Sequence, residues 1–237
     1  MKKIVLTGSN GQLGKNFIDF LKNKNCFIYA LDLHHSDKLN IDNIKYIKID
    51  ITNEDEVEEF YKNNSDCNIL INNAGIGVFT PFEERTKDEF FKVMSVNMYG
   101  TFLMSQQALR FMKKVEYGKI VNIASVYGVV SSDPRIYGNS GRNNSEVYSA
   151  TKAGVIQMTR YMAAHFGKYN IQVNAISPGG IFKKQEKFFV EQYTDRVPME
   201  RMAVAEDLNS ALELLISDKS NYINGQNIIV DGGFSSW

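Results

Sequence analysis

The sequence lacks the features that mark several classes of protein. Its 237 residues carry 27 basic and 27 acidic side chains, so the formal net charge is zero. A balanced charge offers no electrostatic attraction for nucleic acid or an anionic membrane, and we expect neither as a partner. No apolar run approaches the length of a membrane-spanning helix, and the three apolar residues after Lys3 are too few for a secretory signal.

Cysteine and histidine are also scarce. Cys26 and Cys67 each begin an apolar run that is typical of a strand, and neither has metal-ligand spacing around it. We therefore expect reduced, partly buried thiols in a cytoplasmic protein. His34 and His35 are adjacent, but no third ligand is evident. We interpret them as surface residues and predict no metal site.

Strand and helix patterns alternate along the whole chain, with no internal repeat and no linker. The predicted strands are mostly apolar, which is typical of a parallel sheet buried on both faces. We therefore predict one α/β domain over residues 1–237, a Rossmann-like doubly wound parallel sheet flanked by helices. Strands are predicted at 2–6, 27–31, 44–49, 68–71, 119–124, 171–176 and 228–230, and helices after the first glycines and at 54–63, 86–114, 148–166 and 206–216.

A glycine-rich turn follows the first strand, with Gly8, Gly11 and Gly14 ahead of a periodic apolar stretch. Glycine permits a tight turn, and the N-terminus of the next helix offers free N–H groups to a pyrophosphate. Asp32 ends the second strand, where a carboxylate can accept hydrogen bonds from both ribose hydroxyls and would repel the extra phosphate of NADP. The pattern predicts NAD as the cofactor, with NADP second.

Tyr148 and Lys152 stand four residues apart in a predicted helix, so both side chains can point into one cleft. A free tyrosine has a pKa of about 10, and a nearby cation favours the phenolate. We expect Lys152 to lower the pKa of Tyr148 and make it a proton-exchanging group. Alone, the pair is also typical of a solvated helix face.

Small and polar residues follow three predicted strands at the edge where such sheets bind ligands. Asn72-Asn73-Ala74-Gly75 follows the fourth strand, Ser125 the fifth and Pro178-Gly179 the sixth. The polar segment 126–147 then predicts a long irregular loop, and loops of that length usually serve function. Asn97 interrupts a long apolar helix, which requires a bend, a buried hydrogen bond or a functional role.

Taken in order, these landmarks resemble those of the tyrosine-lysine type of short-chain dehydrogenases/reductases, and the resemblance covers the whole chain. It implies that Tyr148 exchanges the proton with the substrate and that Lys152 lowers its pKa and holds the nicotinamide ribose. Ser125 would bind the substrate oxygen, and Asn97 would hold a water in the proton relay. The matching landmarks are Thr7-Gly8, Gly11, Gly14, Asp50-Ile51, Asn72 to Gly75, Asn97, Ser125, Tyr148, Lys152, Pro178-Gly179 and Val230 to Gly233.

The resemblance also implies a dinucleotide site. Asp50 and Ile51 would lie against the adenine, Gly75 against the adenosine and Ile181 near the nicotinamide amide. The full expected set is Gly8, Asn10, Gly11, Gln12, Leu13, Gly14, Asp32, Leu33, Asp50, Ile51, Asn73, Ala74, Gly75, Tyr148, Lys152, Pro178, Gly179 and Ile181.

Three features depart from the family pattern. Gly11 stands one place early, a spacing similar to that of the larger, sugar-nucleotide-modifying branch. Phe182 and Lys183 occupy positions where the family often has a threonine that holds the carboxamide. The interval between Ser125 and Tyr148 is longer than usual, and its extra residues 131–144, which we call the insertion, are expected to border the substrate.

We therefore expect an NAD-dependent oxidoreductase acting on a secondary alcohol or ketone of a polar small molecule. The insertion carries Arg135, Tyr137, Asn139 and Arg142, which suit hydrogen bonding to a sugar-like substrate or simply a solvated loop. It also resembles insertions in relatives associated with surface-sugar or flagellin-glycan pathways.

Two other functions stay open. One is a 3-oxoacyl carrier-protein reductase, although Asp32 and the lack of a basic cluster speak against it. The other is a non-catalytic dinucleotide sensor, although such proteins typically lose the tyrosine or the lysine. The resemblance further implies a homotetramer or homodimer, with helices 97–114 and 148–166 pairing across an interface. Apolar residues such as Phe102, Met158 and Met162 would serve that contact or the core.

Overall fold

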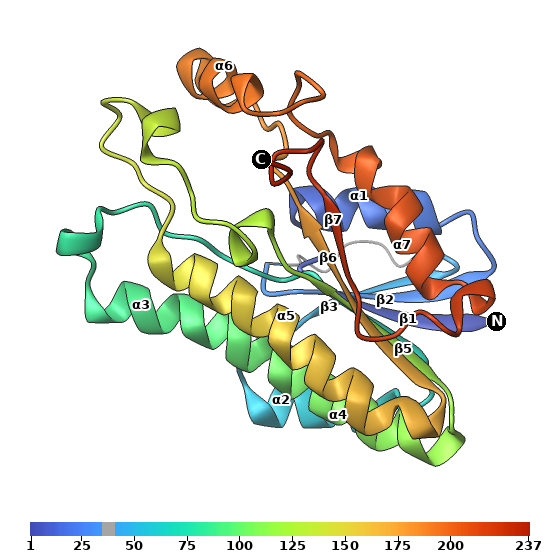
Figure 1. The fold of residues 1–237 in the computed structure, drawn as a ribbon. Coiled ribbons are helices and arrows are strands. Elements are labelled where there is room, and N and C mark those ends of the chain that lie inside the picture. Colours follow the sequence, from blue (N-terminus) through green and yellow to red (C-terminus); the bar gives the residue numbers. More distant parts are fainter. Residues whose placement is uncertain (35–40) are drawn as a thin grey trace.

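The computed structural model describes residues 1–34 and 41–237 and shows the predicted fold (Figure 1); His35 lies outside the described residues. Seven parallel strands form one sheet in the order β3-β2-β1-β4-β5-β6-β7. The strands are β1 Lys2–Thr7, β2 Cys26–Asp32, β3 Ile44–Lys48, β4 Ile69–Asn72, β5 Gly118–Ile123, β6 Ile171–Pro178 and β7 Asn227–Val230. The helices are α1 Gln12–Leu21, α2 Glu54–Asn63, α3 Lys87–Met94, α4 Thr101–Val115, α5 Glu146–Phe166, α6 Lys187–Asp195 and α7 Asn209–Ile216.

The helices cover both faces of the sheet, with α1 and α7 on one side and α2, α4 and α5 on the other (Figure 1). Side chains alternate along each strand, so Val5 joins the core under α2 and α4 while Ile4 and Leu6 join the core under α1 and α7. This confirms the doubly wound, single-domain prediction.

The strand order reverses at β1 and β4, which are neighbours in the sheet although two strands separate them in sequence. Connections leave this point in opposite directions, so the carboxyl ends of the strands border an open crevice. The glycine turn follows β1 there, and Ser125 follows β5. The topology therefore brings the predicted site residues to one edge of the sheet.

The long helix expected at 86–114 forms as two helices. Residues Ser95–Gly100 make a π-helical turn between α3 and α4, with Asn97 buried inside it. Such turns are frequent at functional sites. A second difference is α6, a helix in a polar stretch where we predicted no element; it forms because Phe189, Val190 and Tyr193 pack into a separate apolar cluster.

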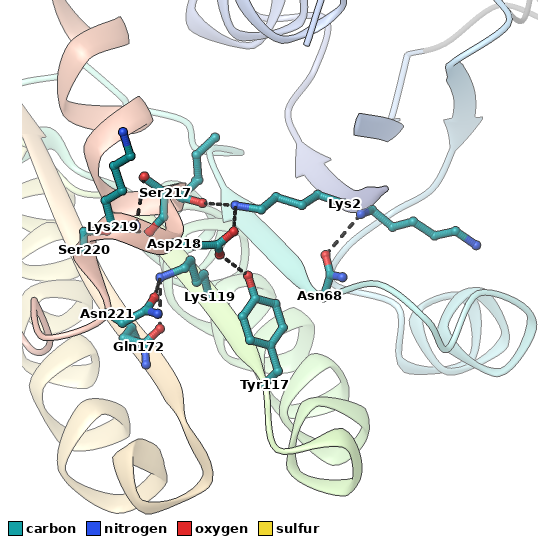
Figure 2. A network of polar contacts seen from close by, with 12 residues as sticks. Lys2, Asn68, Tyr117, Lys119, Gln172, Ser217, Asp218, Lys219, Ser220 and Asn221 are labelled. Carbon is teal, nitrogen blue, oxygen red and sulfur yellow. Dashed lines mark hydrogen bonds and ion pairs between the residues drawn. The ribbon is translucent and has the colours of Figure 1, made fainter. Parts of the chain in front are cut away.

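A polar network closes the opposite, N-terminal edge of the sheet (Figure 2). Lys119 of β5 is 1% exposed, and its Nζ donates to Gln172 Oε1 at 3.0 Å and to Asn221 Oδ1 at 2.8 Å. Tyr117 Oη donates to Asp218 Oδ1 at 2.7 Å. Burial lowers the pKa of Lys119, and the charge of Asp218 opposes that effect. This network joins β5 and β6 to the segment after α7.

Three further expectations can be compared with the described residues. None of their helices is long and apolar enough to cross a membrane. Cys26 and Cys67 are buried free thiols. His34 is exposed, and no cluster of three metal-ligating side chains forms in this part of the chain.

Candidate active site

A cavity of about 420 Å³ opens at the carboxyl ends of β4, β5 and β6. Three of the four residues predicted as catalytic, Ser125, Tyr148 and Lys152, line it. The fourth, Asn97, lies behind the wall. Of the other predicted residues, Leu13, Asn73, Gly75, Pro178, Gly179 and Ile181 also line the cavity.

Lys152 is a buried cation at the base of this cavity. Ser145 caps α5 by accepting a hydrogen bond from Tyr148 N at 3.2 Å, which fixes the first turn of the helix. One turn further on, Lys152 is 5% exposed, and its Nζ donates to Ile123 O at 2.7 Å. Burial lowers the pKa of Lys152 to about 8. An ammonium has three donors, and this one makes a single hydrogen bond to the described residues.

Tyr148 stands above Lys152, whose Nζ lies 5.6 Å from the centre of the phenol ring. Burial raises the pKa of Tyr148, and a side-chain hydrogen bond with Ser125 acts in the opposite direction. Among the chain's own residues, burial therefore outweighs the contact that favours the phenolate, and the lowering of this pKa by Lys152 stays a prediction. The physical reason is that desolvation disfavours the charged form of both groups.

Asn97 holds the loop after β4 against α5. Its Oδ1 accepts from Ile76 N at 2.9 Å, and its Nδ2 donates to Ile76 O at 3.0 Å and to Thr151 Oγ1 at 3.1 Å. A Cβ added at Gly75 would lie 3.3 Å from Lys152 Nζ, so this loop presses directly on the lysine. The side chain of Asn97 is thus occupied in positioning the wall of the cavity.

The glycine turn is locked to the loop after β4. Gly8 has a φ of +64°, and a Cβ there would lie 2.7 Å from Ala74 Cα, so only glycine fits. Thr7 Oγ1 accepts from Asn73 N and Ala74 N, both at 3.0 Å. Asn73 Nδ2 donates to Gly8 O at 2.9 Å.

The start of α1 is open to a ligand. Gly11 is its N-cap and supplies no side-chain hydrogen bond, so the N–H groups of the first turn remain available for an anion. Asp32 lies beside this turn, where its carboxylate accepts from Asn10 N and His34 N, both at 3.0 Å. Leu33 is exposed next to it. These donors and this acid fit the pyrophosphate and a ribose of a dinucleotide.

The predicted adenine contacts differ in exposure. Asp50 is half-buried, and its Oδ1 accepts from Thr52 N at 2.9 Å and Thr52 Oγ1 at 2.7 Å. Ile51 is buried in the core and packs against Gly100, where a Cβ would lie 2.6 Å from Ile51 Cδ1. Asp50 is therefore the more accessible of the two.

The segment after β6 is tied down on both sides. Gly179 N donates to Val230 O at 2.9 Å, and Phe182 N donates to Ala203 O at 2.8 Å. Gln12 Nε2 reaches from α1 to Phe182 O at 2.7 Å, which bridges the glycine turn to this segment. The backbone of the segment is therefore held against both β7 and α1.

Gly14 is buried inside the glycine turn. A Cβ at this position would lie 2.2 Å from Gly8 O and 2.6 Å from Ser9 Cα, so a side chain here would push α1 away from the turn. Its role is to let the first turn of α1 approach the end of β1 closely.

The insertion is partly packed and partly solvated. Ile136 and Tyr137 are buried in an apolar cluster with Tyr193 of α6. Arg135 and Asn139 are exposed. Tyr137 also lines the cavity, so this part of the insertion does border the candidate site.

Several lining residues escaped the sequence analysis. They come from the loop after β4, the segment after β6 and α6, and no motif surrounds them. A spacing of apolar residues typical of a helix at 189, 190, 193 and 197 is the one signal that could have indicated α6. The residues missed include Phe79, Gln185, Phe189 and Tyr193, together with Met202, which follows α6.

The chain matches known proteins over nearly its whole length. A family model for enoyl-(acyl carrier protein) reductase matches residues 34–235. The NAD-dependent glycerol dehydrogenase of Listeria innocua serovar 6a is 30% identical over 99% of this chain and 94% of the relative. The 3-oxoacyl-[acyl-carrier-protein] reductase FabG of Aquifex aeolicus is 31% identical over 97% of this chain and 86% of the relative.

Solved structures agree with this match. A short-chain dehydrogenase from Leptospira borgpetersenii serovar Hardjo-bovis with bound NAD⁺ is 40% identical, with a TM-score of 0.93 over 99% of this chain and 92% of that one. ElxO with NADP bound is 26% identical, with a TM-score of 0.87 over 100% of this chain and 99% of that one. The chain belongs to the short-chain dehydrogenase/reductase family. It is an oxidoreductase of the kind that acts on CH–OH groups with a nicotinamide dinucleotide.

Proposed function

We propose that the protein is an NAD-dependent dehydrogenase that interconverts a secondary alcohol and a ketone on a polar small molecule. The observation that carries the proposal is the grouping of Lys152, Tyr148 and Ser125 in one cavity. Lys152 is charged, buried and bound to one protein acceptor, which leaves donors for a ligand. A purely structural lysine would be expected to use those donors within the protein.

The described residues fit a dinucleotide. The open first turn of α1 would hold the pyrophosphate, Asp32 a ribose, and Asp50 the adenine side of the site. Lys152 would donate to the nicotinamide ribose. When bound, the nicotinamide supplies or accepts a hydride at C4.

The protein's own contribution is proton transfer and placement. Tyr148 would exchange the proton with the substrate oxygen, and Ser125 would donate to that oxygen as charge develops on it. Lys152 would keep positive charge under the phenol. The pKa of Tyr148, raised by burial, would fall beside the positive charge of an oxidised nicotinamide. Asn97 would position the loop after β4 that forms part of the cavity wall. It would also hold a water in the proton relay.

Asp32 supports NAD over NADP. Its carboxylate lies at the end of β2 beside the glycine turn, where the extra phosphate of NADP would meet a negative charge. One similar structure binds NAD⁺ and another binds NADP, so the family accommodates both cofactors.

A polar substrate suits the far wall of the cavity. Asn144 offers an amide group there, and Tyr137 offers a phenol. Glycerol dehydrogenase among the relatives supports a polyol-like substrate, and FabG supports the alternative of a 3-oxoacyl thioester. A dinucleotide sensor is disfavoured because both Tyr148 and Lys152 face the cavity.

We also propose a homotetramer or homodimer in the cytoplasm, with carbohydrate metabolism as the setting and no nucleic-acid or membrane partner. A groove of about 660 Å³ runs along α4 and α5, lined by Phe102 and Met158 and by the otherwise buried Met162. An apolar surface of this kind suits a subunit contact. The two buried free thiols suit a reducing compartment.

The test is a fluorescence titration of the protein with NADH and NADPH, followed by a screen of polyols, sugars and acyl thioesters for cofactor turnover. The proposal predicts NADH binding at least about tenfold tighter, and turnover of a polyol or sugar. Tighter binding of NADPH together with turnover of a 3-oxoacyl thioester would replace it with the carrier-protein reductase. Cofactor binding without turnover of any compound would favour the sensor.

A further inference from the structure

A second, smaller cavity adjoins the candidate active site. It has a volume of about 130 Å³ and lies between the insertion and the start of α6. Phe79, Tyr137, Gln185 and Phe189 line both cavities, so the two adjoin, and we call them the larger and the smaller lobe. The smaller lobe adds Arg142, a charged residue that the catalytic roles above do not use.

Arg142 is held in place at this lobe. Its guanidinium carbon lies 4.3 Å from the centre of the Phe79 ring. The next residue, Asn143, donates its N–H to Phe79 O at 3.0 Å, and Arg142 N donates to Ser140 Oγ at 3.3 Å. Stacking on an aromatic face orients a guanidinium while its in-plane N–H donors stay open.

The guanidinium of Arg142 has no carboxylate partner within ion-pair distance among residues 1–34 and 41–237. Arg135, on the same insertion, does have a carboxylate partner, because its Nη2 donates to Asp133 Oδ2 at 2.7 Å. Glu186 lines the same lobe as Arg142, at the N-cap of α6, but forms no ion pair with it. Among the described residues that line the larger lobe, none is acidic and Lys152 is the charged one.

Tyr137 connects the two lobes electrostatically. Burial is the largest influence on the pKa of Tyr137 and raises it, while the charge of Arg142 lowers this pKa and Tyr148 raises it. Tyr137 also lines both lobes, the smaller together with Arg142 and the larger together with Tyr148. A substrate of several carbons could extend past Tyr137 from one lobe to the other.

We propose that Arg142 binds an anionic group of the substrate, a carboxylate or a phosphate, at the end remote from the reacting carbon. The substrate class is then a hydroxy or oxo compound with a terminal anion. A planar guanidinium recognises either anion through two parallel hydrogen bonds. This inference rests on the proposed function, because it assigns the far end of the same substrate.

The experiment is calorimetric titration of the protein–NADH complex with sorbitol, gluconate and sorbitol 6-phosphate, which share a polyol chain and differ at one end. The wild type should bind at least one anion about tenfold more tightly than sorbitol. The R142Q variant should lose that preference and keep its affinity for NADH. The matched control is R135Q, which removes another exposed arginine of the insertion, one that lines neither lobe, and it should keep the preference.

Gluconate and sorbitol 6-phosphate distinguish the two kinds of anion. Tighter binding of gluconate indicates a carboxylate on the substrate, and tighter binding of sorbitol 6-phosphate indicates a phosphate. Equal binding of all three compounds, a preference that survives R142Q, or a preference lost equally in R135Q would overturn the inference. So would the failure of both anions to bind at millimolar concentration. The proposed function fails separately, by loss of NADH binding or by turnover that persists in Y148F.

Discussion

Two buried lysines lie at opposite ends of the same sheet, and their surroundings differ. Lys119, at the N-terminal edge, donates to the side-chain oxygens of Gln172 and Asn221, with Asp218 nearby (Figure 2). Lys152, at the C-terminal edge, donates to Ile123 O and faces a cavity. Burial lowers the pKa of both. At the N-terminal edge, the protein's own side chains therefore offset the desolvation cost of Lys119. At the C-terminal edge, Lys152 keeps N–H donors that a ligand can use.

Burial of a charge therefore does not by itself indicate function. What separates the two sites is the number of hydrogen bonds left unmade. Lys119 of β5 bonds to β6 and to the segment after α7, and so stabilises the fold. Lys152 lies beside Tyr148 with N–H donors that the protein does not use. The variants below test whether this difference controls catalysis, cofactor binding and stability.

The largest effect is expected at the tyrosine above Lys152. Y148F removes the proton-exchanging hydroxyl, and turnover should fall by about 10²- to 10⁴-fold. Affinity for NADH should stay within about twofold. Steady-state rates and fluorescence titration on one preparation measure both. Turnover equal to the wild type would remove Tyr148 from the mechanism.

Exchange of each lysine for methionine should affect NADH binding at only one edge of the sheet. K152M should weaken NADH binding about 10- to 100-fold, because a charge-assisted hydrogen bond to the ribose is lost. K119M should leave NADH affinity and turnover unchanged, because its partners lie at the other end of the sheet. Fluorescence titration compares them, and equal losses in the two variants would show that the effect is structural.

Cofactor preference should respond to Asp32. D32N keeps an oxygen for Asn10 N but removes the negative charge, so the NADH preference should fall about tenfold. D19N, which alters an exposed aspartate of α1, is the control. Dissociation constants for NADH and NADPH give the ratio. An unchanged ratio in D32N would mean that another group selects the cofactor.

The smallest effect is a pH dependence of cofactor binding. The pKa of Lys152 is about 8, so its ammonium is present below that pH and is lost above it. NADH binding should be constant below about pH 7 and weaken several-fold by about pH 9. The K152M profile should be flat. Weakening of the same size in K152M would assign the pH dependence to another group.

The sequence predicted the sheet, its parallel strands and the edge that holds the site, because each strand is a short apolar run with its own turn residues. It also located a break near Asn97, since asparagine is a poor helix former. It missed α6, whose helical spacing of apolar residues went unread, and it missed the packing of Tyr137, because Tyr193 and Phe234 of the same cluster are remote from Tyr137 in the chain. It did not predict the burial that raises the pKa of Tyr148, because burial depends on tertiary packing. The roles of the site residues remain predictions.

Urea unfolding of K152M and K119M at pH 7 tests the comparison most directly. Lowering the pKa of Lys152 from 10.5 to about 8 costs the folded state about 3 kcal/mol, because the unfolded chain binds the proton more tightly. K152M should therefore be more stable by about 1–2 kcal/mol, after loss of the bond to Ile123 O. K119M should be less stable by about 2 kcal/mol or more, because it leaves buried acceptors unpaired. Equal destabilisation by both variants would contradict the account, since Lys152 would then be a structural lysine like Lys119.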